Sequence, residues 1–408
     1  MSKKLPVLIV NSYAGSLTIA AHQEGHKVIG SYEDGGYGLK IQRHNYPNLD
    51  YRPTVADWPK TQDLSGTLVI AHPPCAAFSQ QVSSAGAHCR GCDAKKFGQT
   101  KQVLEYALAN RAAALAVESV PGALEGARTV HDEVASRHGY TVHRVMQNAA
   151  SWVPQDRPRV WFVFLPVGVT LLMPPLPTGR PVLSDILLPD SDVQRGTWPV
   201  YPWVLKAMVK QAALLKPFHS RVRARLLDGS EGVGMLASVI RRHLLAKGVE
   251  ARELGDVRDV GKLYCEKGAF MSNTLRLLKP DGLASTLVCT TWWSVNGRPL
   301  TALEYQRVMG FPDTYDMITA GSLGAHPGFL SRGVCPPVAR WVLQGLQATV
   351  TRQRGTKGWH RCPAGETLDL RPSRQWLKGP TNDAAGPERP SNDAPLGRTK
   401  SVSRENVT

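Results

Sequence analysis

The thiol of Cys75 is presented by a turn that directly follows a short apolar segment. Residues 68–71 read Leu-Val-Ile-Ala, which is typical of a fully buried strand. Pro73 and Pro74 fix φ and remove backbone donors, so the strand must end before the cysteine. Because open α/β sheets bind ligands at the carboxyl ends of their strands, this position favours a nucleophile. The alternative is a buried structural cysteine, since free cysteines are among the most buried residues.

Carboxyl and guanidinium groups occur at further predicted strand ends. Glu118 follows the apolar run 112–117, and Arg157 and Arg159 stand between two strand-like segments. A thiolate is a strong nucleophile, a carboxylic acid can supply a proton, and an arginine donates permanently charged hydrogen bonds. Each of these groups alone could be an ordinary surface charge or core residue. Together they are a set with which an enzyme could carry out nucleophilic catalysis.

Alternating strands and helices must position these groups. Between residue 5 and about residue 166, short apolar segments alternate with segments of helical pattern. This alternation predicts an α/β fold with a Rossmann-like, mostly parallel sheet and helices on both faces. The predicted strands span residues 6–10, 27–32, 67–71, 112–118, 141–146 and 159–165, and the predicted helices span residues 16–24, 36–46, 99–110 and 126–138.

Further motifs follow one another in a defined order along the chain. They are the small-residue turn Asn11–Leu17, Glu33 after a strand, Val117–Gly122, Gln155–Arg159, Arg298–Thr301 with Glu304, Phe311–Asp313 and Cys335–Ala339. As an ordered set they resemble the cytosine-C5 DNA methyltransferase family, over roughly residues 5–167 and 275–348. The resemblance implies a DNA cytosine-C5 methyltransferase that transfers a methyl group from S-adenosylmethionine to a cytosine flipped out of the duplex.

The resemblance also implies a role for each catalytic group. Cys75 would add to C6 of the cytosine and so make C5 nucleophilic. Glu118 would hydrogen-bond the N3 edge of the ring and supply a proton. Arg159 would hold the ring oxygen O2, and Arg157 would support the thiol side of the site.

By the same resemblance, the S-adenosylmethionine site lies at the first strands of the sheet. Tyr13 and Gly15 would line the cofactor, and Ser16 opens a helix whose amides would bind its carboxylate. Glu33 would take the ribose hydroxyls, and Asp57 would approach the adenine amine. The predicted site also includes Ala14, Leu17 and Pro74.

Four departures from the family pattern change the surroundings of these groups. Leu17 replaces a glycine over the cofactor, and Ser331-Arg332 replaces Gly-Asn in the last motif. His72 stands where the nucleophile turn has a glycine, and Ser119 replaces an asparagine beside the acid. No catalytic group is lost. The alternatives that stay open are a family member using a modified donor, a tRNA cytosine-C5 methyltransferase and a catalytically idle DNA-binding relative.

Changes in composition divide the chain. Residues 1–167 would form the catalytic, S-adenosylmethionine-binding domain, to which residues 275–350 would return. Residues 168–274 lose the α/β pattern and carry basic clusters. By resemblance they would be a smaller target-recognition domain, and a solvated basic helical insertion is the alternative. Residues 351–408 contain much Pro, Gly, Asn, Asp and Ser, which predicts a disordered tail.

The overall charge favours a nucleic-acid partner. The 408 residues carry a formal net charge of +16, and a basic excess of this size favours a polyanion. We therefore expect double-stranded DNA as the partner and a monomeric protein. The resemblance places such an enzyme in restriction–modification or in phage DNA modification.

The cysteine content and the hydropathy of the chain predict the cellular compartment of the protein. Seven irregularly spaced cysteines, no signal peptide and no apolar run of membrane-spanning length predict a soluble, cytoplasmic protein of a bacterial or phage-infected cell. Cys89 and Cys92 form a Cys-x-x-Cys pair that could ligate zinc. Because a structural zinc site needs two further ligands, we expect two reduced thiols and no metal.

Overall fold

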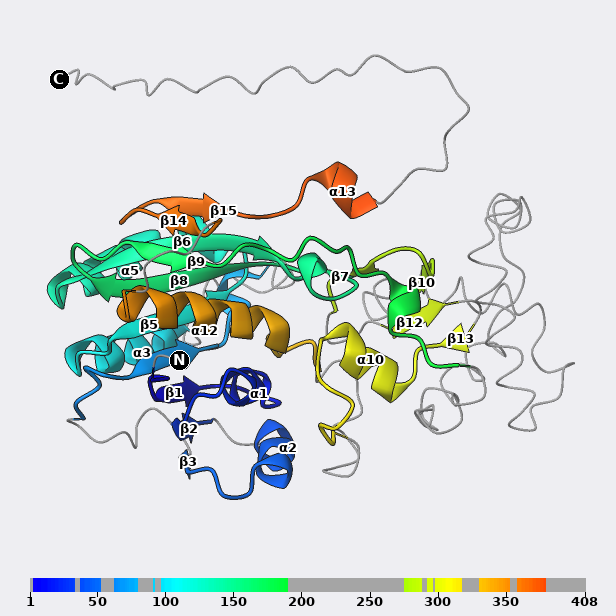
Figure 1. Ribbon diagram of the computed structural model, residues 1–408, viewed down its shortest axis with the longest axis horizontal. Coiled ribbons are helices and arrows are strands. Elements are labelled where there is room, and N and C mark those ends of the chain that lie inside the picture. The colour runs from blue at the N-terminus through cyan, green and yellow to red at the C-terminus, as the bar shows by residue number, and fades with distance from the viewer. Residues whose placement is uncertain are drawn as a thin grey trace, which may run out of the picture.

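An eight-stranded sheet forms the centre of the computed structural model (Figure 1). The structure describes residues 3–33, 37–52, 62–79, 91, 97–189, 275–287, 292–295, 298–317, 330–352 and 358–378. The strand order is β15-β6-β8-β5-β4-β1-β2-β3. These strands are β1 (Val7–Val10), β2 (Val28–Tyr32), β3 (Tyr51–Arg52), β4 (Leu68–Ala71), β5 (Ala114–Ser119), β6 (Tyr140–Asn148), β8 (Pro158–Pro166) and β15 (Thr367–Asp369).

Helices surround this sheet, and short strands lie beside it. The described helices are α1 (Ser16–Gln23), α2 (Tyr37–Asn45), α3 (Gly98–Ala109), α4 (Ala123–Gly126), α5 (Arg128–Arg137), α10 (Ala302–Val308), α12 (Pro336–Val350) and α13 (Arg374–Lys378). The short strands are β7 (Gln155–Asp156), β9 (Leu171–Met173), β10 (Leu275–Leu278), β11 (Ala284–Ser285), β12 (Trp292–Val295), β13 (Arg298–Pro299) and β14 (His360–Cys362). Every strand and helix predicted up to residue 166 is present within a few residues of its expected bounds.

The sheet is parallel except at β8. That strand pairs antiparallel with both β5 and β6, whereas the other pairs in the sheet are parallel. The segment between β6 and β8 explains the reversal, because it spans only residues 149–157. A parallel crossover needs about a dozen or more residues, so the chain turns back beside the strand it has just left. The predicted Rossmann-like, mostly parallel sheet is confirmed.

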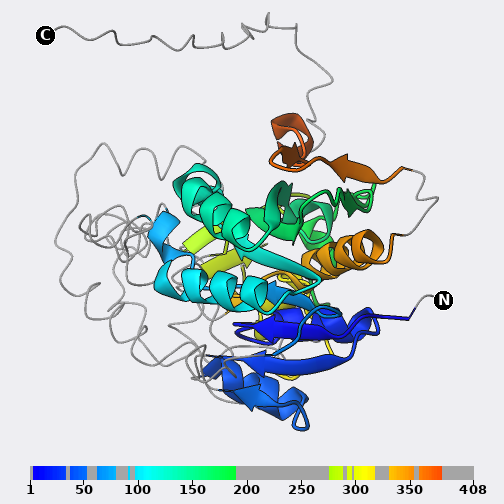
Figure 2. The same ribbon diagram turned by 90° about the vertical axis from the view of Figure 1, so that its left-hand side faces the viewer.

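Both faces of the sheet are covered by helices, as the alternating pattern predicted. In β1, Val7 and Ile9 join the core that includes α1 and α12. Leu8 and Val10 point to the opposite face and join the core under α3 and α5. Figure 2 shows α3 and α5 on one side of the sheet and the orange helix α12 on the other. The site-bearing strand ends are therefore held by two separate apolar cores.

The segment after residue 300 returns to the first helices of the chain. Thr301 and Glu304 cap α10 reciprocally, since the Thr301 Oγ1 accepts from the Glu304 amide at 3.2 Å and Glu304 Oε2 accepts from the Thr301 amide at 2.7 Å. Helix α12 begins with Pro336 and packs on α1. Arg340 on α12 pairs with Glu24 at the end of α1, with 2.9 Å between Nη2 and Oε1.

The prediction of a disordered tail is wrong for residues 358–378. Strand β14 pairs antiparallel with β9, and β15 adds a parallel strand to the edge of the sheet at β6. Backbone hydrogen bonds make this addition, and only single side chains such as Cys362 are buried with it. Strands of three residues show no apolar period, which is why composition alone did not reveal them. Residues 379–408 lie outside the described residues.

Three other predictions fall wholly or mostly outside the described part of the chain. Residues 190–274, which hold most of the predicted target-recognition region, are not described. The same holds for Asp57 and for Cys89 and Cys92. Within the ranges that are described, no helix has the length and hydropathy to cross a bilayer.

Candidate active site

The Cys75 turn extends from the centre of the sheet. Strand β4 is buried along its whole length and lies between β1 and β5. The His72 amide continues the ladder by donating to the Val10 carbonyl at 3.0 Å. The Pro-Pro pair then ends the strand, and Cys75 begins a one-turn 3-10 helix, Ala76–Phe78. Cys75 is only partly buried, so its thiol is a candidate nucleophile rather than a core residue.

The carboxylate of Glu118 lies at the end of the neighbouring strand β5 and is almost completely buried. Its Oε1 is 3.0 Å from Nε of Arg159, which lies near the start of β8. Its Oε2 is 3.2 Å from Nε2 of His72, at the end of β4. Three adjacent strands thus bring one acid, one guanidinium and one imidazole together. The predicted catalytic residues Glu118 and Arg159 are in direct contact.

Arg157 has different partners from Arg159. Its guanidinium is 2% exposed and donates to three backbone carbonyls, those of Leu287 at 3.2 Å, Ser331 at 2.8 Å and Gly333 at 2.8 Å. Burial and, to a lesser extent, the charge of Arg159 lower its pKa to about 10, so the group stays cationic at neutral pH. Arg157 therefore anchors two distant loops to the sheet while adding positive charge near the thiol.

The Cys75 thiol is protonated at neutral pH in this arrangement. Burial is the main cause that raises its pKa above the usual 9.0, and the Glu118 carboxylate raises it further. Arg159 and Arg157 act in the opposite direction. The two arginines are thus the charges of this site that favour the thiolate form.

His72 is the residue of this cluster whose role the sequence did not predict. In the sequence it stands out only because it replaces a glycine of the family pattern. Burial lowers its pKa below 6.5, Glu118 opposes this shift, and Arg157 and Arg159 reinforce it. The imidazole is therefore neutral at pH 7 and contacts the carboxylate as an uncharged partner. The available signal was a titratable side chain at a strand end, three residues before the candidate nucleophile.

The predicted cofactor residues gather at the carboxyl end of β1. The loop after this strand contains two non-glycine residues with positive φ, Asn11 at 55° and Tyr13 at 58°. Such backbone conformations are costly and cluster at functional sites. The buried Glu33 carboxylate supports the loop by accepting from the amides of Ser12 at 2.7 Å and Tyr13 at 3.2 Å. Burial raises the pKa of Glu33 to about 7.

Position 15 in the same loop requires a glycine, because the Tyr315 side chain approaches its backbone closely. Gly15 has φ of +89°, and a Cβ at this position would lie 2.1 Å from the Tyr315 hydroxyl. That hydroxyl donates to the Ala14 carbonyl at 2.7 Å. The loop is thereby fixed to the segment that follows α10.

The remaining predicted cofactor residues are engaged in internal contacts. The Ser16 hydroxyl donates to the Ser12 carbonyl at 3.1 Å and accepts from the Val334 amide at 3.3 Å. Leu17 is fully buried in the core, and its amide donates to Ser12 Oγ at 3.0 Å. Tyr13 is only partly buried, so it is the residue of this loop that can meet a ligand through its ring. Pro74 lies in the Cys75 turn, which follows the carboxyl end of β4.

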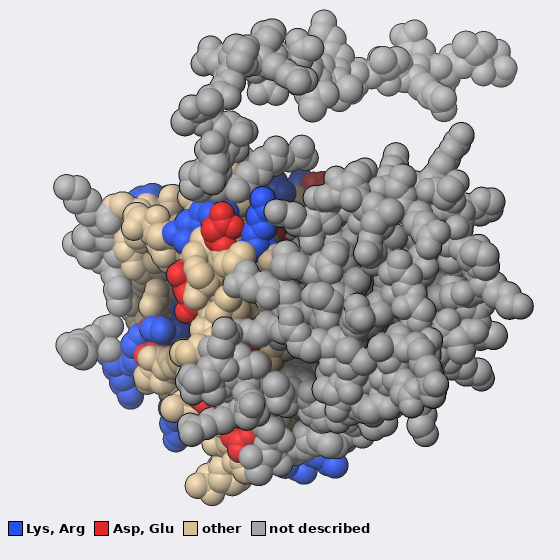
Figure 3. Space-filling model, turned by 90° about the vertical axis from the view of Figure 1, so that its right-hand side faces the viewer, with Lys and Arg blue, Asp and Glu red and all other residues tan. Residues whose placement is uncertain are grey.

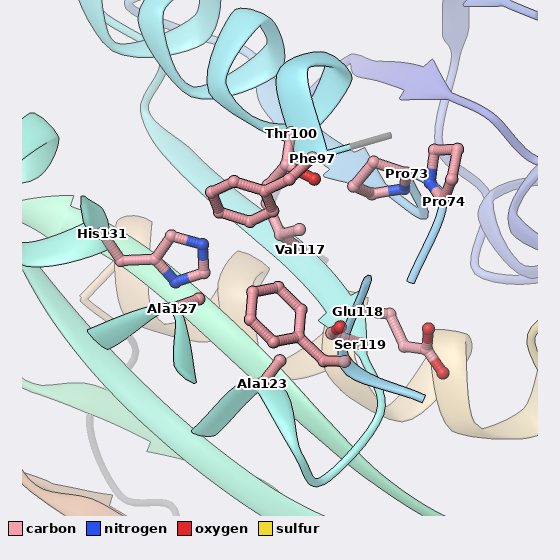
Figure 4. Close-up of a pocket in the computed structure, with 11 residues that line it drawn as sticks. Pro73, Pro74, Phe97, Thr100, Val117, Glu118, Ser119, Ala123, Ala127 and His131 are labelled. Carbon is pink, nitrogen blue, oxygen red and sulfur yellow. The ribbon is translucent and has the colours of Figure 1, made fainter. Parts of the chain in front are cut away.

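A small apolar pocket lies behind the catalytic turn. Its lining includes Pro73, Pro74, Phe97, Val117 and the fully buried His131. Figure 4 shows Glu118 at its edge, with the carboxylate directed away from Phe97 and His131. The acid therefore faces the Cys75 and Arg159 side, and the pocket belongs to the packing under α3 and α5.

Comparison with known proteins identifies the fold. No family model matches the chain, and no curated protein matches it in sequence. A solved structure described as a DNA modification methyltransferase encoded within an E. coli prophage is similar with a TM-score of 0.56 and 18% identity, over 85% of this chain and 100% of that one.

Two further solved structures are similar at a lower level. A mutant DNMT2 of Spodoptera frugiperda has a TM-score of 0.53 and 12% identity, over 84% of this chain and 99% of that one. The methyltransferase EhMeth of Entamoeba histolytica has a TM-score of 0.53 and 11% identity, over 85% of this chain and 98% of that one. At these identities the likeness shows a shared methyltransferase fold.

Proposed function

We propose that this protein is a cytosine-C5 methyltransferase that acts on double-stranded DNA and uses a donor of the S-adenosylmethionine type. The observation that carries the proposal is the Glu118–Arg159 pair at the same sheet edge as the Cys75 turn. A nucleophile, an acid and a cationic donor are what addition to a cytosine ring requires. The strained glycine-containing loop after β1 lies at the same edge, on the strand next to β4.

In the proposed reaction, Cys75 loses its proton and its sulfur bonds to C6 of the cytosine. Arg159, held at 3.0 Å from Glu118, donates to O2 of the ring, where negative charge accumulates. Glu118 protonates N3, which completes an enamine whose C5 is nucleophilic. After C5 has taken the transferred group, loss of the C5 proton, departure of the Cys75 thiolate and return of the N3 proton to Glu118 restore the neutral aromatic ring.

His72 is the positioning residue of this reaction. Its neutral imidazole holds Oε2 of Glu118 at 3.2 Å, while Arg159 holds Oε1. A neutral imidazole can also accept the carboxyl proton and return it, because one ring nitrogen of the uncharged form is an acceptor. Glu118 thus has one uncharged and one charged partner, one at each carboxylate oxygen.

The residues at the end of β1 fit the proposed donor. A donor of this type supplies an electrophilic carbon on a sulfonium. The exposed part of the Tyr13 ring can stack on its base, and the buried Glu33 carboxylate fixes the loop and can take ribose hydroxyls. Asp57 remains a predicted contact to the adenine amine. Ala14 and Gly15 would act through the shape of the loop, because Ala14 is fully buried and the Tyr315 hydroxyl occupies the space beside Gly15.

DNA is favoured over tRNA as the substrate. The net charge of +16 fits an extended phosphate backbone, and the similar E. coli prophage protein is described as a DNA modification enzyme. On the face shown in Figure 3, the described surface carries Lys and Arg beside Asp and Glu. We propose that bases are read by the predicted target-recognition domain, residues 168–274, in the part that follows β9, because β9 itself packs in the core. The rival substrate, tRNA, is included in the test below.

The decisive experiment is covalent trapping. Wild-type protein should form a stable adduct with duplex DNA carrying 5-fluorocytosine, because fluorine at C5 blocks the final elimination. Cys75→Ser should form no adduct, whereas Cys362→Ser, at a buried thiol in β14, should behave as wild type. The measurement is a gel shift under denaturing conditions with mass-spectrometric mapping of the linked peptide.

Three outcomes of the trapping experiment are informative. An adduct in Cys75→Ser would exclude Cys75 as the nucleophile. Trapping on tRNA that carries 5-fluorocytosine, but not on DNA, would show that tRNA is the substrate. A folded wild-type protein that traps neither nucleic acid would favour the catalytically idle relative.

A further inference from the structure

Two glycines follow the strand that carries Glu118, and neither is required by its own backbone conformation. Gly122 precedes α4 with φ of −60° and ψ of −19°, values that any residue adopts. Gly126 is the last residue of α4, so its backbone is helical as well. A helical glycine is less stable than an alanine at the same position. The reason for a glycine at these two positions must therefore lie in the space around them.

That space is taken by Phe78, the last residue of the 3-10 helix that follows Cys75. A Cβ at position 122 would lie 2.5 Å from the Phe78 carbonyl oxygen. A Cβ at position 126 would lie 2.8 Å from both Cδ1 and Cε1 of the Phe78 ring. Both distances are too short for a real contact, so either methyl group would displace Phe78. The two bare backbones thus accommodate Phe78, one its carbonyl and the other its ring.

Phe78 also has a partner on α3 and is tied to the nucleophile. Its ring makes an edge-to-face contact with Phe97, with 5.3 Å between the ring centroids. Phe97 is 2% exposed and precedes the first residue of α3. The Phe78 amide donates to the Cys75 carbonyl at 3.1 Å. Phe78 therefore connects the turn of the nucleophile with the segment that follows the strand of the acid.

The position of the Cys75 turn affects both the charge and the aim of the thiol. The Glu118 carboxylate raises the pKa of Cys75, whereas Arg159 and Arg157 lower it. These influences depend on distance, so a shift of the turn relative to β5 and β8 changes the acidity of the thiol. A misplacement of the reacting atom by about 1 Å can also cost a hundredfold in rate.

We propose that Phe78 is a second positioning residue, which fixes Cys75 relative to Glu118 by packing on the bare backbones of Gly122 and Gly126. This inference rests on the proposed function and adds to it a residue that touches neither substrate nor donor. The two glycines act differently. A methyl group at position 122 would push on the backbone of the Cys75 turn, whereas one at position 126 would push on the Phe78 ring alone.

The first test follows the thiol and needs no nucleic acid. The full chain is alkylated with iodoacetamide between about pH 6 and pH 10, and labelling of Cys75 is measured by peptide mapping. Phe78→Ala and Gly126→Ala should each move the pH midpoint of alkylation by about half a unit or more, because the thiol shifts against its charged neighbours. Gly98→Ala, at the open first position of α3, is the matched control and should keep the wild-type profile.

The second test is a double-mutant cycle on the rate of trapping with 5-fluorocytosine DNA. Phe78→Ala and Gly126→Ala should each slow adduct formation by about tenfold or more, while the affinities for DNA and donor stay within about twofold. The double variant should be no slower than Phe78→Ala, because the ring that meets the new methyl group is gone. Gly122→Ala meets the Phe78 carbonyl, which Phe78→Ala retains, so the effects of these two changes should multiply.

The outcomes separate this inference from the proposed function. Wild-type alkylation profiles and trapping rates in Phe78→Ala and Gly126→Ala, with circular dichroism showing both folded, would reduce Phe78 to a packing role. Equal losses in trapping rate and in affinity for DNA and donor would also overturn the inference, since they indicate a general structural effect. A wild type that traps neither DNA nor tRNA would contradict the proposed function, and the alkylation profiles would still decide whether Phe78 positions Cys75.

Discussion

At the scale of single residues, the buried Glu118 carboxylate lies between one charged and one uncharged partner. One carboxylate oxygen faces a permanent cation, Arg159, and the other faces His72, which is neutral at pH 7. Of these two partners, only the imidazole gains a charge when the pH falls, because the guanidinium is always cationic. The contact with His72 therefore makes a prediction about the pH dependence of turnover.

Replacing His72 should change the acidic limb of the pH–rate profile. The pKa of His72 lies below 6.5. When the pH falls through the pKa of His72, the imidazole becomes an imidazolium that forms an ion pair with Glu118 and prevents proton donation. The cations Arg157 and Arg159 also face this group and oppose that protonation. His72→Gln should keep a hydrogen-bond donor and most of the rate, but lose this limb. His72→Gly should lower the single-turnover rate by about tenfold, because the acid loses one orienting contact.

Single-turnover rates between pH 5 and 9 provide the measurement for the His72 prediction. Circular dichroism at each pH serves as the control for folding. A wild-type profile in both variants would show that His72 has a packing role only.

At the scale of elements, the loop after β1 and the segment after α10 depend on each other. The Tyr315 hydroxyl occupies the space that a side chain at position 15 would fill, and it donates to the Ala14 carbonyl. The glycine is therefore explained by a tertiary contact as well as by its φ of +89°.

Gly15→Ala should destabilise the protein by about 1–3 kcal/mol, from positive-φ strain and from the clash with the Tyr315 hydroxyl. Tyr315→Phe alone should cost about 1 kcal/mol, for the lost hydrogen bond to Ala14. The double variant should lose less than the sum, because removing the hydroxyl relieves the clash. A double-mutant cycle from urea denaturation gives the coupling free energy. Strict additivity would mean that the two positions do not meet.

Because β15 pairs with β6 at the edge of the sheet, we expect the chain beyond residue 352 to stabilise the sheet. Truncation after residue 352 removes β14 and β15, exposes the edge of β6 and deprives the buried His143 of its 2.9 Å contact with the Cys362 carbonyl. The expected loss in the free energy of unfolding is roughly 2–3 kcal/mol, about the burial of one apolar side chain plus its backbone pairing. Truncation after residue 378 keeps both strands and is the matched control. Equal unfolding midpoints for the two truncations would show that β14 and β15 add nothing.

At the scale of the whole molecule, one buried histidine couples stability to pH. His131 on α5 is 1% exposed among Phe97, Phe162 and Phe164, and neither ring nitrogen has a hydrogen-bond partner among the described residues. Burial and, to a lesser extent, the charge of Arg144 lower its pKa to about 3. The folded state therefore requires the neutral imidazole.

The direction in which His131 makes stability depend on pH follows from the number of protons that the folded and unfolded states bind. Between pH 6.5 and about pH 3 the unfolded chain binds the proton that the folded protein refuses, so stability falls as the pH is lowered through this window. The contribution is at most about 1.4 kcal/mol per pH unit. His131→Phe and His131→Leu should flatten this part of the stability curve. Urea denaturation at a series of pH values tests this, and parallel curves for wild type and both variants would contradict it.

The sequence by itself determined the framework of the molecule. Apolar periodicity located the strands and helices up to residue 166, and the Pro-Pro-Cys turn located a thiol at the end of β4. The placement of Glu118 at the end of β5 also followed, because a carboxyl group after an apolar run has to lie at a strand end. These features depend on residues that are close together in the sequence. The periodicity of apolar residues over a short segment is therefore enough to predict them.

Only the tertiary structure decided how these groups are paired. Arg157 and Arg159 are alike in the sequence, yet one holds carbonyls at residues 287, 331 and 333 and the other holds Glu118. The His72–Glu118 contact joins residues 46 positions apart, and β15 reaches β6 from more than 200 residues away. Such partners are selected by packing between distant elements, and no local periodicity encodes them.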